Sequence, residues 1–143
     1  MTAGLLSLSQ EAEPAPETVA AIVDGMNDYN AAFWPGANWA ARYIVGRDAA
    51  GAVQSGLKFI TACEWLFVNW LWVATPYRKR GEGSRLMKAA EDDARAAGRH
   101  GAYLDTFSFQ APEFYRRLGY SEFGRIADFP PGFARIWLMK RFS

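Results

Sequence analysis

Five basic side chains gather in one short segment of the sequence, between Arg78 and Lys88, and two glycines lie among them. With one acidic residue, Glu82, the segment carries a local net charge of +4, whereas the whole chain carries +1. Gly81 and Gly83 have no side chain, so a ligand can approach the backbone amides closely. A helix that begins here would add unpaired amides and about half a positive charge. This combination predicts a binding site for a phosphate or diphosphate group, and a solvated basic turn is the alternative.

Two common phosphate-binding motifs do not fit this segment. A P-loop requires a lysine directly after its last glycine, but Ser84 and Arg85 follow Gly83. A dinucleotide-binding fingerprint requires a third glycine, and Leu86 occupies that position. A nucleic-acid-binding module is a further alternative, but the rest of the chain offsets the local charge and carries no nucleic-acid motif. We therefore expect no nucleic-acid partner.

The elements on either side of the basic segment can hold it in place. The stretch Glu64–Thr75 is almost continuously apolar, which predicts a central strand buried on both faces, and Pro76 ends it. A helix is predicted over Ser84–Ala97, with Glu91 away from its apolar stripe and Gly98 at its C-terminal cap. The stripe consists of Leu86, Ala90, Ala94 and Ala97.

The remaining pattern predicts alternating strands and two further helices. A helix opens at Pro16, and a first strand over Leu5–Leu8 is an option before it, with a loop over Asn30–Asn38. Strands are expected over Arg42–Arg47, Ala52–Thr61, Gly101–Thr106, Tyr120–Ile126 and Ala134–Lys140, with a hairpin turn at Asp48–Gly51 and a short helix over Pro112–Leu118. By the usual crossover geometry, the Gly101–Thr106 strand runs parallel to the Glu64–Thr75 strand. The sequence therefore predicts one α+β domain, residues 1–143, with a mixed, largely antiparallel sheet.

Length and composition exclude several classes of protein. A chain of 143 residues that is 50% hydrophobic is long enough for one buried core. One cysteine and one histidine exclude a disulfide framework and a multi-Cys or His-based metal site, so no metal is expected. We expect Cys63 as a small buried residue and His100 at the surface. No run approaches the roughly 18 apolar residues of a membrane span, and the first residues lack the positive charge of a secretory signal. Cytoplasmic location without a membrane partner is therefore expected.

Two motifs in this order resemble those of the GCN5-related N-acetyltransferase (GNAT) superfamily. The pattern Arg78-x-x-Gly81-x-Gly83 resembles motif A of the family, between an apolar strand and an amphipathic helix. The segment Ala111–Tyr120 resembles motif B, and the spacing of one helix plus one strand also fits. The resemblance extends from about Arg42 to the C-terminus. It implies a three-layer α/β/α arrangement around a central mixed, mostly antiparallel sheet of about six or seven strands.

The resemblance also implies an activity and a set of site residues. Members of the family transfer an acetyl group from acetyl-CoA to a primary amine of a small molecule or peptide, by direct attack in a ternary complex. By similarity, the backbone of one strand pairs with the pantetheine arm, amides of the loop bind the diphosphate, and motif B packs near the acyl group. The implied cofactor-binding residues are Leu71, Trp72, Val73, Arg78, Lys79, Arg80, Gly81, Glu82, Gly83, Ser84, Ser108, Ala111 and Phe114.

Tyr115 is the expected catalytic residue, because the resemblance places it near the sulfur atom. A tyrosine hydroxyl, with an ordinary pKa of about 10, can protonate a leaving thiolate if it is well placed; a core-packing tyrosine is the alternative. No motif identifies a base. Where histone-modifying relatives have a catalytic glutamate, this sequence has Phe67, so we expect a water relay, with Asn69 or Asp105 as helpers. Ser108 takes the place of an asparagine that is frequent in the family.

The acceptor and the assembly are less constrained by the sequence. The first 41 residues carry acidic but no basic side chains, which suggests a cationic or amphipathic amine as acceptor, with a solvated helix face as the alternative. A non-catalytic acyl-CoA-binding or regulatory module of the same fold is the second functional hypothesis. Because dimers are common in the family, a homodimer is also an expectation.

Overall fold

The computed structural model describes residues 2–34 and 39–143, which belong to two compact units, residues 1–36 and 37–143. The first unit contains helix α1, Pro16–Asn30, which starts with a proline at its first position as predicted. The optional strand over Leu5–Leu8 is wrong, because this stretch has no regular secondary structure and no strand pairs with it. In the expected loop Asn30–Asn38, α1 extends to Asn30 and residues 31–34 form turns. The last four residues of that expected loop, 35–38, lie outside the described residues.

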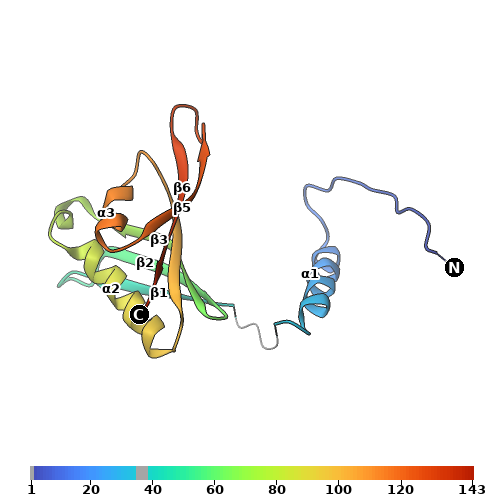
Figure 1. The fold of residues 1–143 in the computed structure, drawn as a ribbon, viewed down its shortest axis with the longest axis horizontal. Helices are drawn as coiled ribbons and strands as arrows, with labels where there is room; N and C mark the ends of the chain where they lie inside the picture. The colour runs from blue at the N-terminus through green and yellow to red at the C-terminus, as the bar shows by residue number, and fades with distance from the viewer. Residues whose placement is uncertain (1, 35–38) are drawn as a thin grey trace. The chain divides into compact units, whose positions relative to one another are not determined.

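The second unit is built on a six-stranded sheet with the order β1-β2-β3-β4-β6-β5 (Figure 1). Only β3 and β4 run parallel among these described strands, and the other neighbouring strands are antiparallel. This sheet confirms the predicted α+β class with a mixed, mostly antiparallel sheet. The strands are β1 (Ala40–Arg47), β2 (Val53–Ala62), β3 (Trp65–Val73), β4 (Gly101–Phe107), β5 (Ser121–Ala127) and β6 (Ala134–Arg141).

The parallel pair separates part-way along its length. Strands β3 and β4 are paired from Trp65–Gly101 to Val68–Leu104. Beyond Val68, the strand β3 stays paired with β2 alone, after a register shift that leaves Asn69 without a partner residue on β2. A bulge of this kind bends a strand and increases its twist. The second half of β3 therefore has one edge that no strand of the described chain occupies.

Two helices of the second unit pack on the same core. Helix α2, Glu82–Ala96, lies along one face of the sheet and contacts β1 to β4 (Figure 1). Helix α3, Pro112–Arg117, adds Phe114 and Tyr115 to that core. Gly98 and Gly119 follow the two helices with positive φ angles of 73° and 97°, as expected of C-terminal caps. A helical layer on the opposite face of the sheet stays a prediction.

The apolar stripe of α2 is confirmed only in part. Leu86, Ala90 and Ala94 are buried, but Ala97 lies beyond the helix and is exposed. The placement of Glu91 on the polar side is wrong, because its side chain is buried at 4% exposure. The Nζ atom of Lys140 donates a 2.7 Å hydrogen bond to Glu91 from strand β6, and this partner explains how the carboxylate can be buried.

The predictions for the turns between strands are correct for one turn and wrong for a residue in another. The hairpin turn at Asp48–Gly51 is confirmed, and the Asp48 carboxylate accepts hydrogen bonds from the amides of Ala50 and Ala52. The prediction of a buried Cys63 is wrong: the residue is exposed in the β2–β3 turn, with φ at 51°. His100 is exposed, as predicted.

Among the residues that the structure describes, no helix is long and apolar enough to cross a membrane.

Candidate functional site

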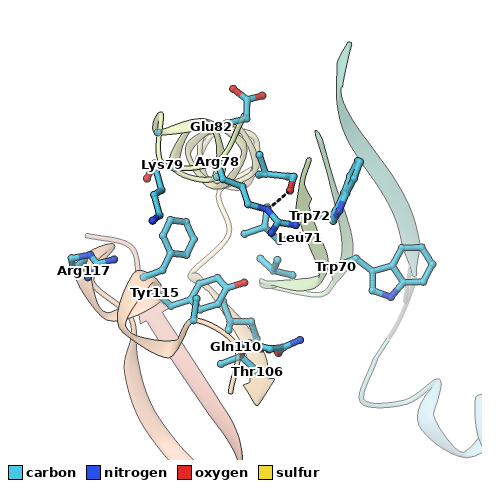
Figure 2. Close-up of a pocket in the computed structure, with 18 of the residues that line it drawn as sticks. Trp70, Leu71, Trp72, Arg78, Lys79, Glu82, Thr106, Gln110, Tyr115 and Arg117 are labelled. Atoms are coloured by element: carbon cyan, nitrogen blue, oxygen red, sulfur yellow. Dashed lines mark hydrogen bonds between the residues drawn. The ribbon is translucent and has the colours of Figure 1, made fainter. Parts of the chain in front are cut away.

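A cavity of about 980 Å³ opens where β3 and β4 separate (Figure 2). The second half of β3 forms one wall, the first turn of α2 and the loop before it form another, and α3 with the end of β4 closes the remaining side. Leu71, Tyr115 and Thr106, which come from three different elements, border the same space. The site therefore exists because the parallel pair separates, and it is large enough for a cofactor-sized ligand.

The loop before α2 presents its backbone to this cavity. Lys79 and Gly81 adopt left-handed conformations, with φ angles of 58° and 80°, and a lysine in this region is uncommon. The Arg85 amide donates to the Gly81 carbonyl, whereas the amides of Glu82, Gly83 and Ser84 have no acceptor among the described residues. Unpaired amides at a helix N-terminus next to left-handed residues form a typical anion-binding concavity.

Arg78 braces this loop against the end of strand β3. Its Nε atom donates a 2.8 Å hydrogen bond to the Val73 carbonyl, shown as the dashed line in Figure 2. The side chains of Arg78 and Lys79 also line the cavity. Two cationic groups beside unpaired amides create a positive field at this end of the site, which suits a phosphate or diphosphate group.

Tyr115 lies at the other end of the cavity and is held by two aromatic neighbours. Its ring contacts Phe114 at a centroid distance of 5.0 Å and Tyr120 at 6.2 Å, both with edge-on geometry. Burial raises the pKa of Tyr115 to about 12, and the negative charge of Asp105 adds to this effect. The hydroxyl group therefore stays protonated at neutral pH, as a proton donor requires.

Asp105, named as one of two helpers for a water relay, also lines the cavity. Its carboxylate is paired with the guanidinium of Arg135 on the neighbouring strand β6, at 2.8 Å. Asn69, the other helper, lines the cavity at the bulge in β3. The structure thus brings both residues to the same cavity as Tyr115.

Sequence reasoning missed several cavity residues, and Gln110 is the clearest case. Its Oε1 atom accepts hydrogen bonds from Thr106 Oγ1 at 2.8 Å and from the Phe107 amide at 2.9 Å. These bonds fix the turn that leads from β4 to α3, and so they position Tyr115. The signal in the sequence was only a glutamine before motif B. Other lining residues that were not predicted are Val68, Trp70, Tyr77, Leu104, Thr106 and Arg117.

Most residues predicted to bind the cofactor border this one cavity, but two do not. Ser108 Oγ accepts a hydrogen bond from the Ala134 amide at 2.9 Å, which fixes the start of β6. Arg80 also lies outside the lining. The predicted residues that line the cavity are Leu71, Trp72, Val73, Arg78, Lys79, Gly81, Glu82, Gly83, Ser84, Ala111 and Phe114, together with Tyr115.

The acidic, histidine and cysteine side chains do not gather around this cavity. Within residues 2–34 and 39–143, no three such side chains lie close enough together to hold a metal ion. The chemical groups that the described cavity offers therefore include unpaired amides, three cationic side chains, a protonated phenol and two paired carboxylates.

Comparison with known proteins assigns the class of the chain. The family model described as "Acetyltransferase (GNAT) domain" matches residues 38–122. Blasticidin-S acetyltransferase of Streptomyces morookaense is 42% identical over 101 residues, which are 70% of this chain and 73% of that protein. An acetyltransferase of Agrobacterium fabrum is 34% identical over 126 residues, which are 88% of this chain and 92% of that protein.

A solved structure has the same fold over nearly the whole chain. The crystal structure of an acetyltransferase from Bacillus cereus superposes with a TM-score of 0.84 at 28% identity, over 94% of this chain and 98% of that one. The chain therefore belongs to the GNAT superfamily, as the two motifs indicated. It is an acetyltransferase of that family.

Proposed function

We propose that this chain transfers an acetyl group from acetyl-CoA to a primary amine of a small molecule by direct attack in a ternary complex. The observation that supports this most is the single cavity that joins a loop with unpaired amides at one end to a protonated, partly buried tyrosine at the other. GNAT homologues bind acetyl-CoA or coenzyme A. Acetyl-CoA has groups in an order that matches this cavity: a diphosphate, an extended arm and a reactive thioester.

The residues of the cavity fit such a donor in three places. Amides from Glu82 to Ser84, with Arg78 and Lys79, match the diphosphate in charge and hydrogen bonding. The edge of β3 from Leu71 to Val73 faces away from β2 and has no strand partner beyond Val68. An extended pantetheine arm with amide groups can add to that edge as an extra strand.

The chemistry that bound acetyl-CoA supplies is an activated acyl group. The acceptor nitrogen forms a bond to the carbonyl carbon, the bond from that carbon to sulfur breaks, and the nitrogen loses a proton. In this proposal, backbone amides of the bulged part of β3, near Asn69, stabilise negative charge on the carbonyl oxygen, which is typically worth a few kcal/mol. Tyr115 donates a proton to the departing sulfur. A water relay near Asp105 takes the proton from the amine.

The acceptor that we propose is a cationic small-molecule amine of the blasticidin S type. The relative with the highest identity reported above is a blasticidin-S acetyltransferase. On this chain, Trp70 borders the cavity, and Lys58 Nζ lies 4.2 Å from the centre of one ring of its exposed indole. Tryptophan rings attract cations, so Trp70 is a candidate contact for a cationic acceptor. Peptide amines are the competing acceptors. We also propose that residues 1–143 act as one cytoplasmic domain and assemble as a homodimer.

Two measurements on the purified protein test this function. Isothermal titration calorimetry with acetyl-CoA should show saturable binding, and the thermal midpoint should rise with the same ligand. An assay of free thiol release with a panel of amines, including blasticidin S, an aminoglycoside, a polyamine and a peptide, should identify one class with clear turnover. Binding without turnover on any amine would favour the non-catalytic module, and absence of acetyl-CoA binding would overturn the proposal.

A further inference from the structure

Behind the glycine loop, a buried serine holds the one acidic side chain of the basic segment. Ser55 Oγ, on strand β2, donates a 2.8 Å hydrogen bond to Oε1 of Glu82, the first residue of α2. Ser55 is almost fully buried, at 1% exposure. The second carboxylate oxygen, Oε2, is paired with the guanidinium of Arg85 at 2.8 Å. Both oxygens of this carboxylate therefore have fixed partners on the side of the loop away from the main cavity.

The backbone around this pair is shaped to leave room for it. A Cβ atom at Gly46, on strand β1, would lie 2.0 Å from Ser55 Oγ and 3.0 Å from Glu82 Oε1. The first of these distances is far shorter than van der Waals contact, so a side chain at position 46 would displace the Ser55 hydroxyl from this hydrogen bond. A second cavity of about 140 Å³ lies here, bordered by Ser55, Glu82 and Arg85. Three elements, β1, β2 and α2, thus contribute to the placement of one carboxylate.

The position of the Glu82 carboxylate matters because the amides of the same turn face the main cavity. Glu82 lies between Gly81 and Gly83, in the turn whose amides face the main cavity. A carboxylate free to rotate into that cavity would repel a diphosphate and would compete for the same amides. Figure 2 shows the carboxylate of Glu82 directed away from Tyr115 and Leu71. Its side chain is 20% exposed, whereas that of Arg85 is 80% exposed, so Ser55 is the buried and better fixed of the two partners.

We propose that Ser55 is a positioning residue for the donor: it keeps the Glu82 carboxylate turned away from the diphosphate site and so makes the loop selective for a diphosphate-containing donor. This inference rests on the proposed function, because it assumes that the loop binds the diphosphate of acetyl-CoA. It adds a residue outside both sequence motifs, on a strand that contributes nothing to the lining of the main cavity.

The test compares two donors on Ser55→Ala, Glu82→Gln, the double variant and one control. With acetyl-CoA, Ser55→Ala should raise KM about tenfold with kcat unchanged, because the released carboxylate opposes the diphosphate. With S-acetylpantetheine, which has no diphosphate, the same variant should behave like the unaltered protein. In the background of Glu82→Gln, which removes the charge, Ser55→Ala should have little further effect on KM. Thr61→Val, another buried hydroxyl on β2, is the matched control and should change neither donor's KM.

The possible results separate this inference from the function on which it rests. If Ser55→Ala weakens both donors equally, or if Glu82→Gln does not suppress its effect, Ser55 has only a structural role and the proposal is wrong. An unchanged KM for acetyl-CoA, in a variant with an unchanged thermal midpoint, overturns it as well. If the unaltered protein does not bind acetyl-CoA at all, the proposed function fails first and this inference fails with it.

Discussion

The carboxylate of Asp105 and the hydroxyl group of Tyr115 face the same cavity, and the charge of the first contributes to the pKa of the second. Burial is the larger cause of the rise in the Tyr115 pKa to about 12, and Asp105 is the smaller one. Arg135 holds Asp105 from the neighbouring strand at 2.8 Å. The tyrosine is thus kept neutral without any hydrogen bond to the acidic residue, which leaves its proton available for a substrate atom.

Replacement of Tyr115 by phenylalanine tests its role as a proton donor. We expect kcat to fall about 10²- to 10⁴-fold, the usual range for a lost acid–base group, because the departing sulfur must then take its proton from water. The dissociation constant of acetyl-CoA, measured by calorimetry, should be unchanged, since the ring remains. Phe107→Leu, outside the cavity lining, serves as a control for loss of an aromatic contact. An unaltered kcat in the Tyr115 variant would remove this residue from the mechanism.

The pH dependence of stability provides a second check on the same residue. Because the folded-state pKa of Tyr115 is raised above the ordinary value of 10, burial of the neutral hydroxyl stabilises the fold fully below pH 10. This contribution is lost as the pH rises from about 10 to about 12. Denaturant unfolding across this interval should therefore show a smaller pH dependence in Tyr115→Phe than in the unaltered protein. Equal slopes would mean that the hydroxyl titrates normally.

Substitution of Asp105 by asparagine should lower the pKa of Tyr115, but only partly. The charge disappears while burial, the larger cause, remains. Ultraviolet titration of this variant, compared with the double variant that also carries Tyr115→Phe, isolates the phenol in question. An unchanged titration curve would show that Arg135 already neutralises the carboxylate.

The buried ion pair of Glu91 and Lys140 should be sensitive to loss of either partner. Lys140→Met leaves the Glu91 carboxylate, 5% exposed, with Arg95 as its remaining cation at 3.4 Å. We expect a loss of about 3 kcal/mol in the free energy of unfolding, measured with urea. The matched control is Lys88→Met, which removes an exposed pair with Asp92 at 2.6 Å and should cost at most about 0.5 kcal/mol. Similar losses in the two variants would contradict this interpretation.

Substitution of Gly81 should destabilise the fold because of the backbone conformation of this residue. Its φ angle of 80° is a left-handed conformation, which costs an alanine roughly 1–2 kcal/mol. A Cβ atom would meet nothing within 4 Å, so steric collision adds nothing to this cost. Gly81→Ala should therefore lower the thermal midpoint by a few degrees, and acetyl-CoA affinity should fall as the loop changes shape. A variant with unchanged stability would indicate that the loop adopts another conformation.

Local patterns were sufficient to predict most of the fold. The apolar run of Trp65–Val73, the period of α2 and the glycines after α2 and α3 each depend on neighbouring residues in the chain, so they can be recognised in sequence. Glu91 could not be placed in this way, because its burial depends on Lys140, which lies 49 residues further along the chain. The exposure of Cys63 likewise follows from the tight β2–β3 turn, which has no strong sequence signal.

The candidate site was predictable where it coincides with motifs and not elsewhere. Gly81, Gly83 and Tyr115 fall within the two motif-like segments, and the structure brings all three to one cavity. Ser55 carries no such signal, because its partner Glu82 is 27 residues away and a serine within a strand has many other uses. Gln110 fixes the turn before α3 through hydrogen bonds to the end of β4, and these bonds depend on the conformation of the turn.

The short parallel contact between β3 and β4 has a mechanical consequence. The two antiparallel halves of the sheet are hydrogen-bonded to each other only between the pairs Trp65–Gly101 and Val68–Leu104. A ligand that inserts beyond Val68 would lengthen this seam and tie the halves together. Amide hydrogen exchange along β4 should then slow on cofactor binding more than exchange in the β1–β2 hairpin, so that the cofactor serves as a removable structural brace as well as a reagent.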